Sequence, residues 1–96
     1  MKKIALNGKE HNAKPFDFNL VCDLEDLGIS MENLGRKPMI TIRAYIALCM
    51  NATLEVAGKE IEKHIANGGN LEDAIKVMSD LMEESDFFRA LAKAEN

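Results

Sequence analysis

The run from Pro38 to Met50 constrains the fold of this 96-residue chain more than any other segment. It begins with a proline, which suits the first turn of a helix, and nearly every later position is apolar. The apolar positions form two stripes at helical spacing: Met39, Ile42, Ile46 and Cys49 on one face, and Ile40, Ala44, Ala47 and Leu48 on another. A helix that is apolar on nearly all sides is typical of a protein interior. The run is too short to span a bilayer, which takes about 20 residues. We therefore predict a central buried helix in a small soluble domain.

The composition predicts one globular domain over residues 1–96. Hydrophobic residues make up 47% of the chain, which argues against a disordered protein and allows a modest core. The net charge of -4 argues against nucleic acid as a partner, because such binding depends on Lys and Arg at the phosphates. Residues 51–96 carry ten acidic and five basic side chains. Any electrostatic partner of this half should therefore be basic.

A β-hairpin is predicted at the N-terminus, with strands at about 3–6 and 9–13. Asn7-Gly8 lies between two short extended runs, and both residues tolerate positive φ. A lone two-stranded hairpin is marginal in water. It must therefore lean on the helices or be completed by strands from another chain.

Short helices are predicted from about residue 18 to 94. Phe16 and Phe18 are the expected anchors of the connection into the core, and Asp17 or Asn19 should cap the first helix. The first helix is predicted from about Phe18 to Leu27, stopped by Gly28, and a short turn follows at Met31–Leu34, capped by Ser30 and ended by Gly35. After the helix at 38–50, another is predicted at about 54–66, with Thr53 as its cap, Asn67-Gly68-Gly69 after it and an apolar stripe of Leu54, Ala57, Ile61 and Ile65. A helix capped by Asn70 follows, and the last runs from Asp86 to about Ala94 after a break at Ser85. The predicted fold is α+β and mostly α: a short N-terminal β-hairpin (about 3–13) followed by a compact bundle of four to six short helices around the central apolar helix (about 38–50).

We find no residue pattern that indicates catalysis, a metal or a cofactor. His64 and Glu60 are an i,i+4 pair, but two ligands do not make a zinc site. Gly68-Gly69 does not follow a strand, and no Lys-Ser/Thr follows it, so it is not a phosphate loop. Cys22 and Cys49 have no CxxC spacing, which indicates two reduced thiols in a cytosolic protein. The sequence predicts a non-enzymatic protein without a signal peptide.

The C-terminal aromatic pair is harder to explain as core packing alone. Phe87 and Phe88 are adjacent, so on a helix they point about 100° apart. One of them, or Leu91, is expected to be partly exposed near the C-terminus, and burial of both stays open. Met78 and Met82 lie on an amphipathic stripe, where flexible thioethers suit a surface that accepts varied apolar partners, although ordinary core packing is the preferred interpretation.

Two segments carry a family resemblance that spans nearly the whole chain. The run from Ala57 to Gly69, followed by a short amphipathic helix and then Glu84-Ser85-Asp86-Phe87-Phe88-Arg89-Ala90-Leu91, resembles the tail assembly chaperones of long-tailed bacteriophages and prophages of Gram-positive bacteria. The resemblance implies a non-enzymatic protein in the cytoplasm of the bacterial host. It implies binding of the tape measure protein, displacement as tail tube subunits polymerise, and self-association. The tail tube protein is a further candidate partner.

Our hypothesis for the partner-binding site is the C-terminal apolar stripe. A tape measure helix offers long apolar stripes, and a chaperone needs a matching groove of aliphatic, Met and aromatic side chains. The residues assigned to this site are Met78, Leu81, Met82, Phe87, Phe88 and Leu91.

Two alternatives come from other classes of protein. A helix-turn-helix DNA-binding domain would use the helix after Gly68-Gly69, but that helix carries Glu72, Asp73 and Asp80 against Lys76 alone. That is the wrong sign for a DNA groove. An acidic carrier protein would need a modified serine in an Asp-Ser-Leu setting, which neither of the two candidate serines, Ser30 and Ser85, has.

Overall fold

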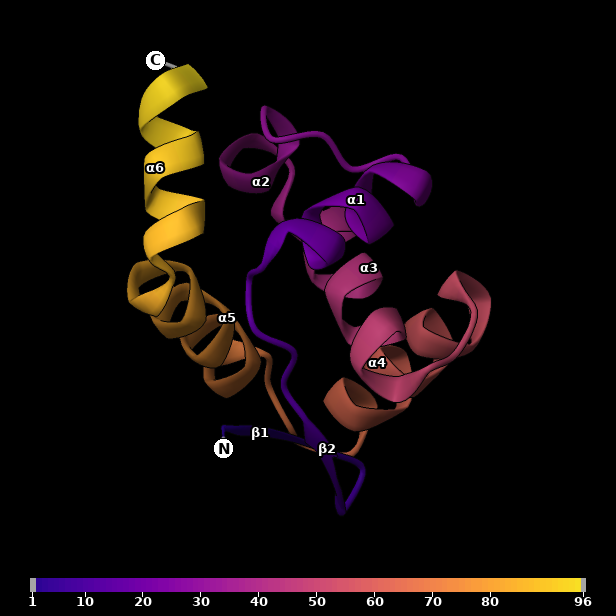
Figure 1. Ribbon diagram of the computed structural model, residues 1–96. Coiled ribbons are helices and arrows are strands. Elements are labelled where there is room, and N and C mark those ends of the chain that lie inside the picture. The colour runs from indigo at the N-terminus through magenta and orange to yellow at the C-terminus, as the bar shows by residue number, and fades with distance from the viewer. Residues whose placement is uncertain (1, 96) are drawn as a thin grey trace.

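The computed structural model describes residues 2–95 as a small hairpin followed by helices (Figure 1). Within those residues, two antiparallel strands precede six helices, which confirms the predicted mostly-α α+β fold. The elements are β1 (Lys3–Leu6), β2 (Lys9–Asn12), α1 (Phe18–Asp26), α2 (Asn33–Arg36), α3 (Pro38–Met50), α4 (Leu54–Ala66), α5 (Glu72–Glu84) and α6 (Asp86–Glu95).

The hairpin turns at Asn7 and Gly8, as predicted. Both residues have positive φ, 53° and 76°, which is the conformation of a two-residue hairpin turn. Leu6 pairs with Lys9 to close the turn. Ile4 and Leu6 point inward and are buried, and β1 packs against α4 and α5. The hairpin therefore leans on helices of its own chain, which is one of the two predicted arrangements.

Helix α3 forms the centre of the core and has the predicted bounds. Tyr45 is fully buried, its ring stacks on Phe16 at a centroid distance of 5.2 Å, and its hydroxyl donates to the Lys14 carbonyl at 2.6 Å. The Thr41 hydroxyl is also buried and donates to the Lys37 carbonyl at 2.8 Å. These bonds satisfy the polar atoms of an otherwise apolar helix, so their burial carries no unpaired donor or acceptor. Asn51, in the left-handed conformation, ends the helix.

Three predicted core residues are exposed instead. Phe18 lies on the side of α1 opposite Leu20 and is 63% exposed, so Phe16 alone anchors the connection. Met39, in the first turn of α3, is also 63% exposed. Ile65 is 49% exposed because successive i+4 steps rotate about 40° around a helix and carry it away from the side of Ala57. The apolar stripes predicted for α3 and α4 were therefore too long, by Met39 and by Ile65.

The short helix α2 was predicted two residues too early. The prediction ended it at Gly35, but Gly35 lies inside α2 and does not have a positive φ. The carbonyl of Asn33 accepts hydrogen bonds from the Lys37 amide at 2.9 Å and from the Thr41 hydroxyl at 3.2 Å. These bonds connect the first residue of α2 to the first turn of α3.

The link between α4 and α5 depends on two glycines and one histidine. Gly68 has a φ of 93°, which favours glycine. A Cβ on Gly69 would overlap the ring of His64.

Thr53 caps α4 through the Val56 amide at 3.1 Å, as predicted. The Asn70 side chain accepts from the Glu72 amide at 3.0 Å, although Leu71 holds the cap position of α5 itself.

The break between α5 and α6 at Ser85 is confirmed. The Ser85 hydroxyl accepts from the Phe88 amide at 2.9 Å and donates to the Phe16 carbonyl at 2.6 Å. Helix α6 then leaves the end of α5 and rises beside α2 in Figure 1. Within residues 2–95, no single helix is long and apolar enough to cross a membrane, and α3 and α4 reach that length and composition only as a pair bent by 105°.

Candidate partner-binding surfaces at the C-terminal helices

The six predicted site residues do not form one exposed stripe. Met78 and Phe88 belong to the core, at 7% and 8% exposure, whereas Phe87 is 37% exposed. The adjacent aromatics therefore point in different directions, as their spacing requires. The remaining three residues are half-buried and pack at the edge of the core: Leu81, Met82 and Leu91.

Phe88 attaches α6 to the central helix. Its ring meets the edge of Phe16 at a centroid distance of 5.2 Å, and Phe16 in turn stacks on Tyr45. Such edge-to-face contacts add to the effect of burial by about 0.5–1.5 kcal/mol. Phe88 therefore holds the C-terminal helix in place and cannot itself be a freely exposed contact.

An uncharged groove lies where α6 and α5 approach α2 and the start of α3. Its volume is about 420 Å³, and three methionines line it. The lining given by residues 2–95 contains no charged side chain and consists of Met31, Leu34, Gly35, Pro38, Ile75, Met78, Ser79, Met82, Phe88 and Ala92. We call this surface the methionine groove. It includes three of the predicted site residues and adds Ile75, which is 37% exposed.

A second, smaller cleft contains two other predicted residues, Leu81 and Phe87. Its volume is about 280 Å³, and it lies between the connection before α1 and the junction of α5 with α6. It is lined by Pro15, Phe16, Asp17, Leu81, Glu84, Ser85 and Phe87. We call it the aromatic cleft. Leu91 lines neither the groove nor the cleft.

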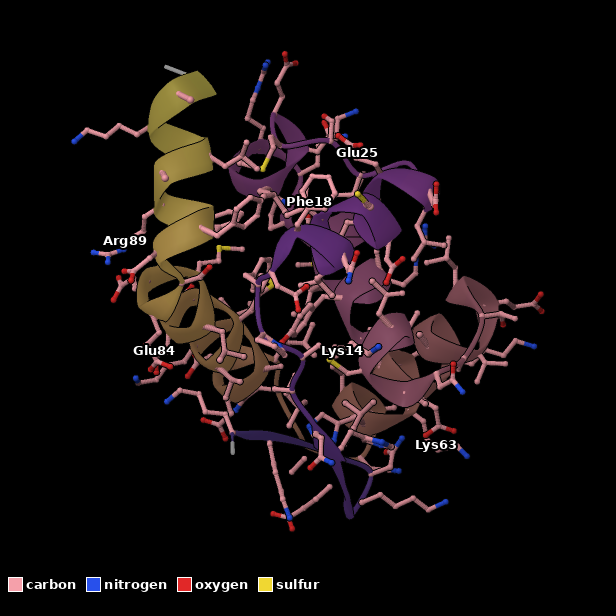
Figure 2. The ribbon with its side chains drawn as sticks, in the orientation of Figure 1. Lys14, Phe18, Glu25, Lys63, Glu84 and Arg89 are labelled. Carbon is pink, nitrogen blue, oxygen red and sulfur yellow. The ribbon has the colours of Figure 1, made fainter. Side chains whose placement is uncertain are left out.

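Phe18 extends the aromatic cleft onto α1. Its ring meets Phe87 edge-to-face at a centroid distance of 5.9 Å, on the side of α1 that faces α6 (Figure 2). The sequence predicted Phe18 as a core anchor, not as a surface residue. The signal that could have found it is its position opposite Leu20 and Leu24, which face the core.

A cavity of about 710 Å³, larger than the groove and the cleft, lies at the hairpin turn and is polar. Here the Asn7 amide donates to Nδ1 of His64 at 3.2 Å, so Nε2 carries the proton and donates to the Asn70 carbonyl at 3.2 Å. The Asn7 side chain donates to the carboxylate of Glu60 at 2.6 Å. These groups bind the hairpin to α4 and to the start of α5. Among residues 2–95, no three His, Cys, Asp or Glu side chains gather in a way that could hold a metal ion.

Cys49 is in a setting that suppresses thiol reactivity. Burial raises the pKa of the Cys49 thiol, which accepts a hydrogen bond from the Lys14 amide at 3.5 Å. A reactive cysteine needs the opposite shift, toward the thiolate. Cys22 and Cys49 are both free and half-buried.

Comparison of the chain with protein-family models, curated proteins and solved structures gives no match. The two apolar surfaces flanking the α5–α6 junction are therefore the main structural basis for a functional proposal.

Proposed function

We propose that this protein is a non-enzymatic tail assembly chaperone that binds the tape measure protein and keeps it soluble during tail tube assembly in the bacterial cytoplasm. The observation that carries the proposal is the methionine groove. It is an open apolar surface of about 420 Å³, built from α5 and α6 together with α2 and the start of α3. Helix α6 contains the C-terminal segment that contributes to the family resemblance.

The side chains of the groove suit a helical polypeptide of variable sequence. Met31, Met78 and Met82 have flexible, polarizable thioethers that can adjust to different apolar partners. An amphipathic helix presents apolar side chains at i, i+3, i+4 and i+7, and a groove without charges can accept them along its length. A tape measure protein, as the resemblance describes it, offers many such stretches.

The same groove suits a partner that must later be released. The lining given by the described residues has no charged group, so apolar contact would contribute most of the binding. The hollow that adjoins it at Met82, Phe88 and Ala92 carries Glu83, Arg89 and Lys93. Apolar contacts are non-directional and can be exchanged for another apolar surface. Displacement by polymerising tail tube subunits requires such exchange. Self-association and direct contact with the tail tube protein stay predictions of the resemblance.

The charges of α5 do not favour the DNA-binding alternative. Glu72 and Asp73 occupy its first turn, and Lys76 is paired with Asp80 at 2.9 Å. A recognition helix with this charge distribution would repel the phosphates that flank a DNA groove.

Co-expression with the tape measure protein of the same genome tests the proposal. The measurement is the fraction of the tape measure protein that stays in the supernatant. Wild-type chaperone should raise this fraction several-fold, and Ile75→Lys should remove most of the gain because it places a charge in the groove. Phe88 is unsuitable for this test because it is buried against Phe16, and a charge there would unfold the protein.

Ile65→Lys is the matched control for this experiment. Ile65 is an exposed isoleucine on α4, outside the groove, so its replacement removes similar apolar surface without touching the site. It should solubilise the tape measure protein as well as the wild type does. The proposal is wrong if Ile75→Lys and Ile65→Lys act alike, or if the wild-type protein has no effect.

A further inference from the structure

The aromatic cleft differs from the methionine groove in its charge. Within residues 2–95, the charged side chains that line it, Asp17 and Glu84, are both acidic. Asp86, next to Phe87, does not line the cleft and is paired with Arg89, so the negative edge consists of Asp17 and Glu84. Glu84 is 3.4 Å from Lys2, but both side chains are solvent-accessible, so this pair contributes little and can be exchanged. The cleft therefore presents apolar walls with a negative edge.

The cleft is small. Its volume of about 280 Å³ lies at the lower end of the roughly 300–1,000 Å³ of typical ligand pockets and is enough for one or two side chains. The exposed rings of Phe18 and Phe87 continue the apolar surface beyond it. Exposed aromatic side chains at a small cleft are typical anchors of polypeptide interfaces.

The backbone around the cleft leaves no place for an added strand. Asp17 caps the start of α1 by accepting from the Leu20 amide at 2.9 Å, and Ser85 caps the start of α6 through the Phe88 amide. None of the described residues that line the cleft belongs to a strand. A partner therefore has no strand edge to pair with here and must satisfy its own backbone, as a helix does.

We propose that the aromatic cleft docks a basic amphipathic helix. An apolar side chain of that helix enters between Pro15 and Phe87, and Lys or Arg side chains of the adjacent turns lie at Asp17 and Glu84. This inference rests on the proposed function and adds the sign of the partner's charge and a contribution from α1. The acidic edge disfavours two other occupants of the cleft because both are negatively charged. They are a second copy of this chain, with a net charge of -4, and an anionic lipid surface.

The test uses two synthetic helical peptides of equal length and the full protein. Both peptides carry leucine at i, i+3, i+4 and i+7, and their other positions are lysine in one and glutamate in the other. Calorimetry should give a Kd for the lysine peptide at least about tenfold lower than for the glutamate peptide, and the difference should shrink with added salt. Equal affinities for the two peptides would overturn the inference.

Charge-removing variants locate the binding. Asp17→Asn combined with Glu84→Gln removes both charges, and Asn keeps the helix cap of α1. This variant should weaken binding of the lysine peptide about tenfold, as should Phe87→Ala. The controls remove equivalent groups on α4, through Glu55→Gln with Glu62→Gln, and through Val56→Ala, where valine is 47% exposed. Loss of affinity in the controls equal to that in the cleft variants would contradict the assignment.

Other occupants of the cleft are separate outcomes. Two results would overturn the inference that the cleft binds a basic helix. One is binding to vesicles of phosphatidylcholine and phosphatidylserine that depends on Phe87, and the other is a dimer that Phe87→Ala dissociates. The co-expression assay separates this inference from the proposed function. If Ile75→Lys does not solubilise the tape measure protein while the Asp17→Asn, Glu84→Gln variant solubilises it fully, the chaperone proposal stands and the cleft assignment is wrong. If the wild-type protein does not solubilise the tape measure protein but the lysine peptide binds the cleft, the proposed function is wrong and the cleft assignment stands.

Discussion

Helices α3 and α6 use their apolar residues in different ways. In α3, six residues are buried, and the helix is covered on nearly every side. In α6, among residues 86–94, Phe88 alone is buried, and the apolar face continues into half-buried and exposed side chains. Burial of apolar surface is the main source of stability. The difference teaches that α3 holds the fold together, whereas α6 leaves part of its apolar surface exposed, where we propose that a partner binds.

The attachment of α6 shows how this is achieved. The first turn of α6 is attached at Phe16, in the connection before α1: the Phe88 ring packs on the Phe16 ring, and the Ser85 hydroxyl donates to the Phe16 carbonyl. Phe18, two residues later, meets Phe87. The rest of α6 is half-buried or exposed among residues 89–94. A helix held at few points can open locally at a lower free energy than the core. We therefore expect the two regions to respond differently to mutation.

The largest expected contrast is between core and edge truncations. Tyr45→Ala should lower the free energy of unfolding by about 3–5 kcal/mol, because it leaves a cavity beside Phe16 and removes the bond to Lys14. Leu91→Ala, at a half-buried position on α6, should cost about 1 kcal/mol. Urea denaturation measures both. Equal losses would mean that α6 is as deeply integrated as α3.

On the hairpin side of the core, the close approach of Gly69 to His64 should make alanine costly. Gly69→Ala must displace the ring that binds Asn7 and Asn70, so we expect a loss of about 1–3 kcal/mol in thermal unfolding. The control is Gly35→Ala, where an added Cβ meets no atom within 4 Å and φ is not positive. Gly35→Ala should be neutral or slightly stabilising. A neutral Gly69→Ala would contradict the role given to His64.

Ser85 should control α6 without affecting α3. Ser85→Ala removes the helix cap and the bond to the Phe16 carbonyl, for a loss of about 1–2 kcal/mol. Amide hydrogen exchange should become faster in α6 and stay unchanged in α3. Ser79→Ala, at an exposed position of α5, is the control and should change neither helix. Faster exchange throughout the protein would show that the two helices unfold as one unit.

The smallest expected effect is a pH dependence of the core. Burial raises the pKa of Tyr45, so the folded state retains a proton that the unfolded state releases above its ordinary pKa of about 10. The stabilisation is therefore complete at neutral pH and is lost as the pH rises through that value. Tyr45→Phe should cost about 1 kcal/mol at pH 7, for the bond to Lys14, but lose less stability between pH 9 and about 11. Parallel pH profiles of the two proteins would contradict this assignment.

The parts of the fold predicted correctly were those with complete local signals. Asn7-Gly8 specifies a hairpin turn, and the bounds of α3 follow from Pro38 and Asn51, which start and end an unbroken apolar run. The burial of Phe18 was predicted wrongly because Phe18 was treated as part of the connection, whereas it is the first residue of α1 and lies opposite Leu20 and Leu24.

The candidate site could be predicted only as a set of residues. Phe87 and Phe88 were expected to diverge, and they do, but their neighbours Phe16 and Phe18 are about 70 positions away in the sequence. The walls of the aromatic cleft exist only because the chain turns at Ser85 and brings α6 against that connection. No local pattern encodes such a meeting of distant segments.

The most direct test of the central proposal is chemical-shift mapping of the labelled protein with a helical segment of the tape measure protein. The account predicts shifts at residues that line the two surfaces, including Ile75, Met82 and Phe87, with the buried middle of α3 (41–47) and the cavity at His64 unchanged. Shifts centred on the His64 cavity, or no shifts at saturating peptide, would contradict it.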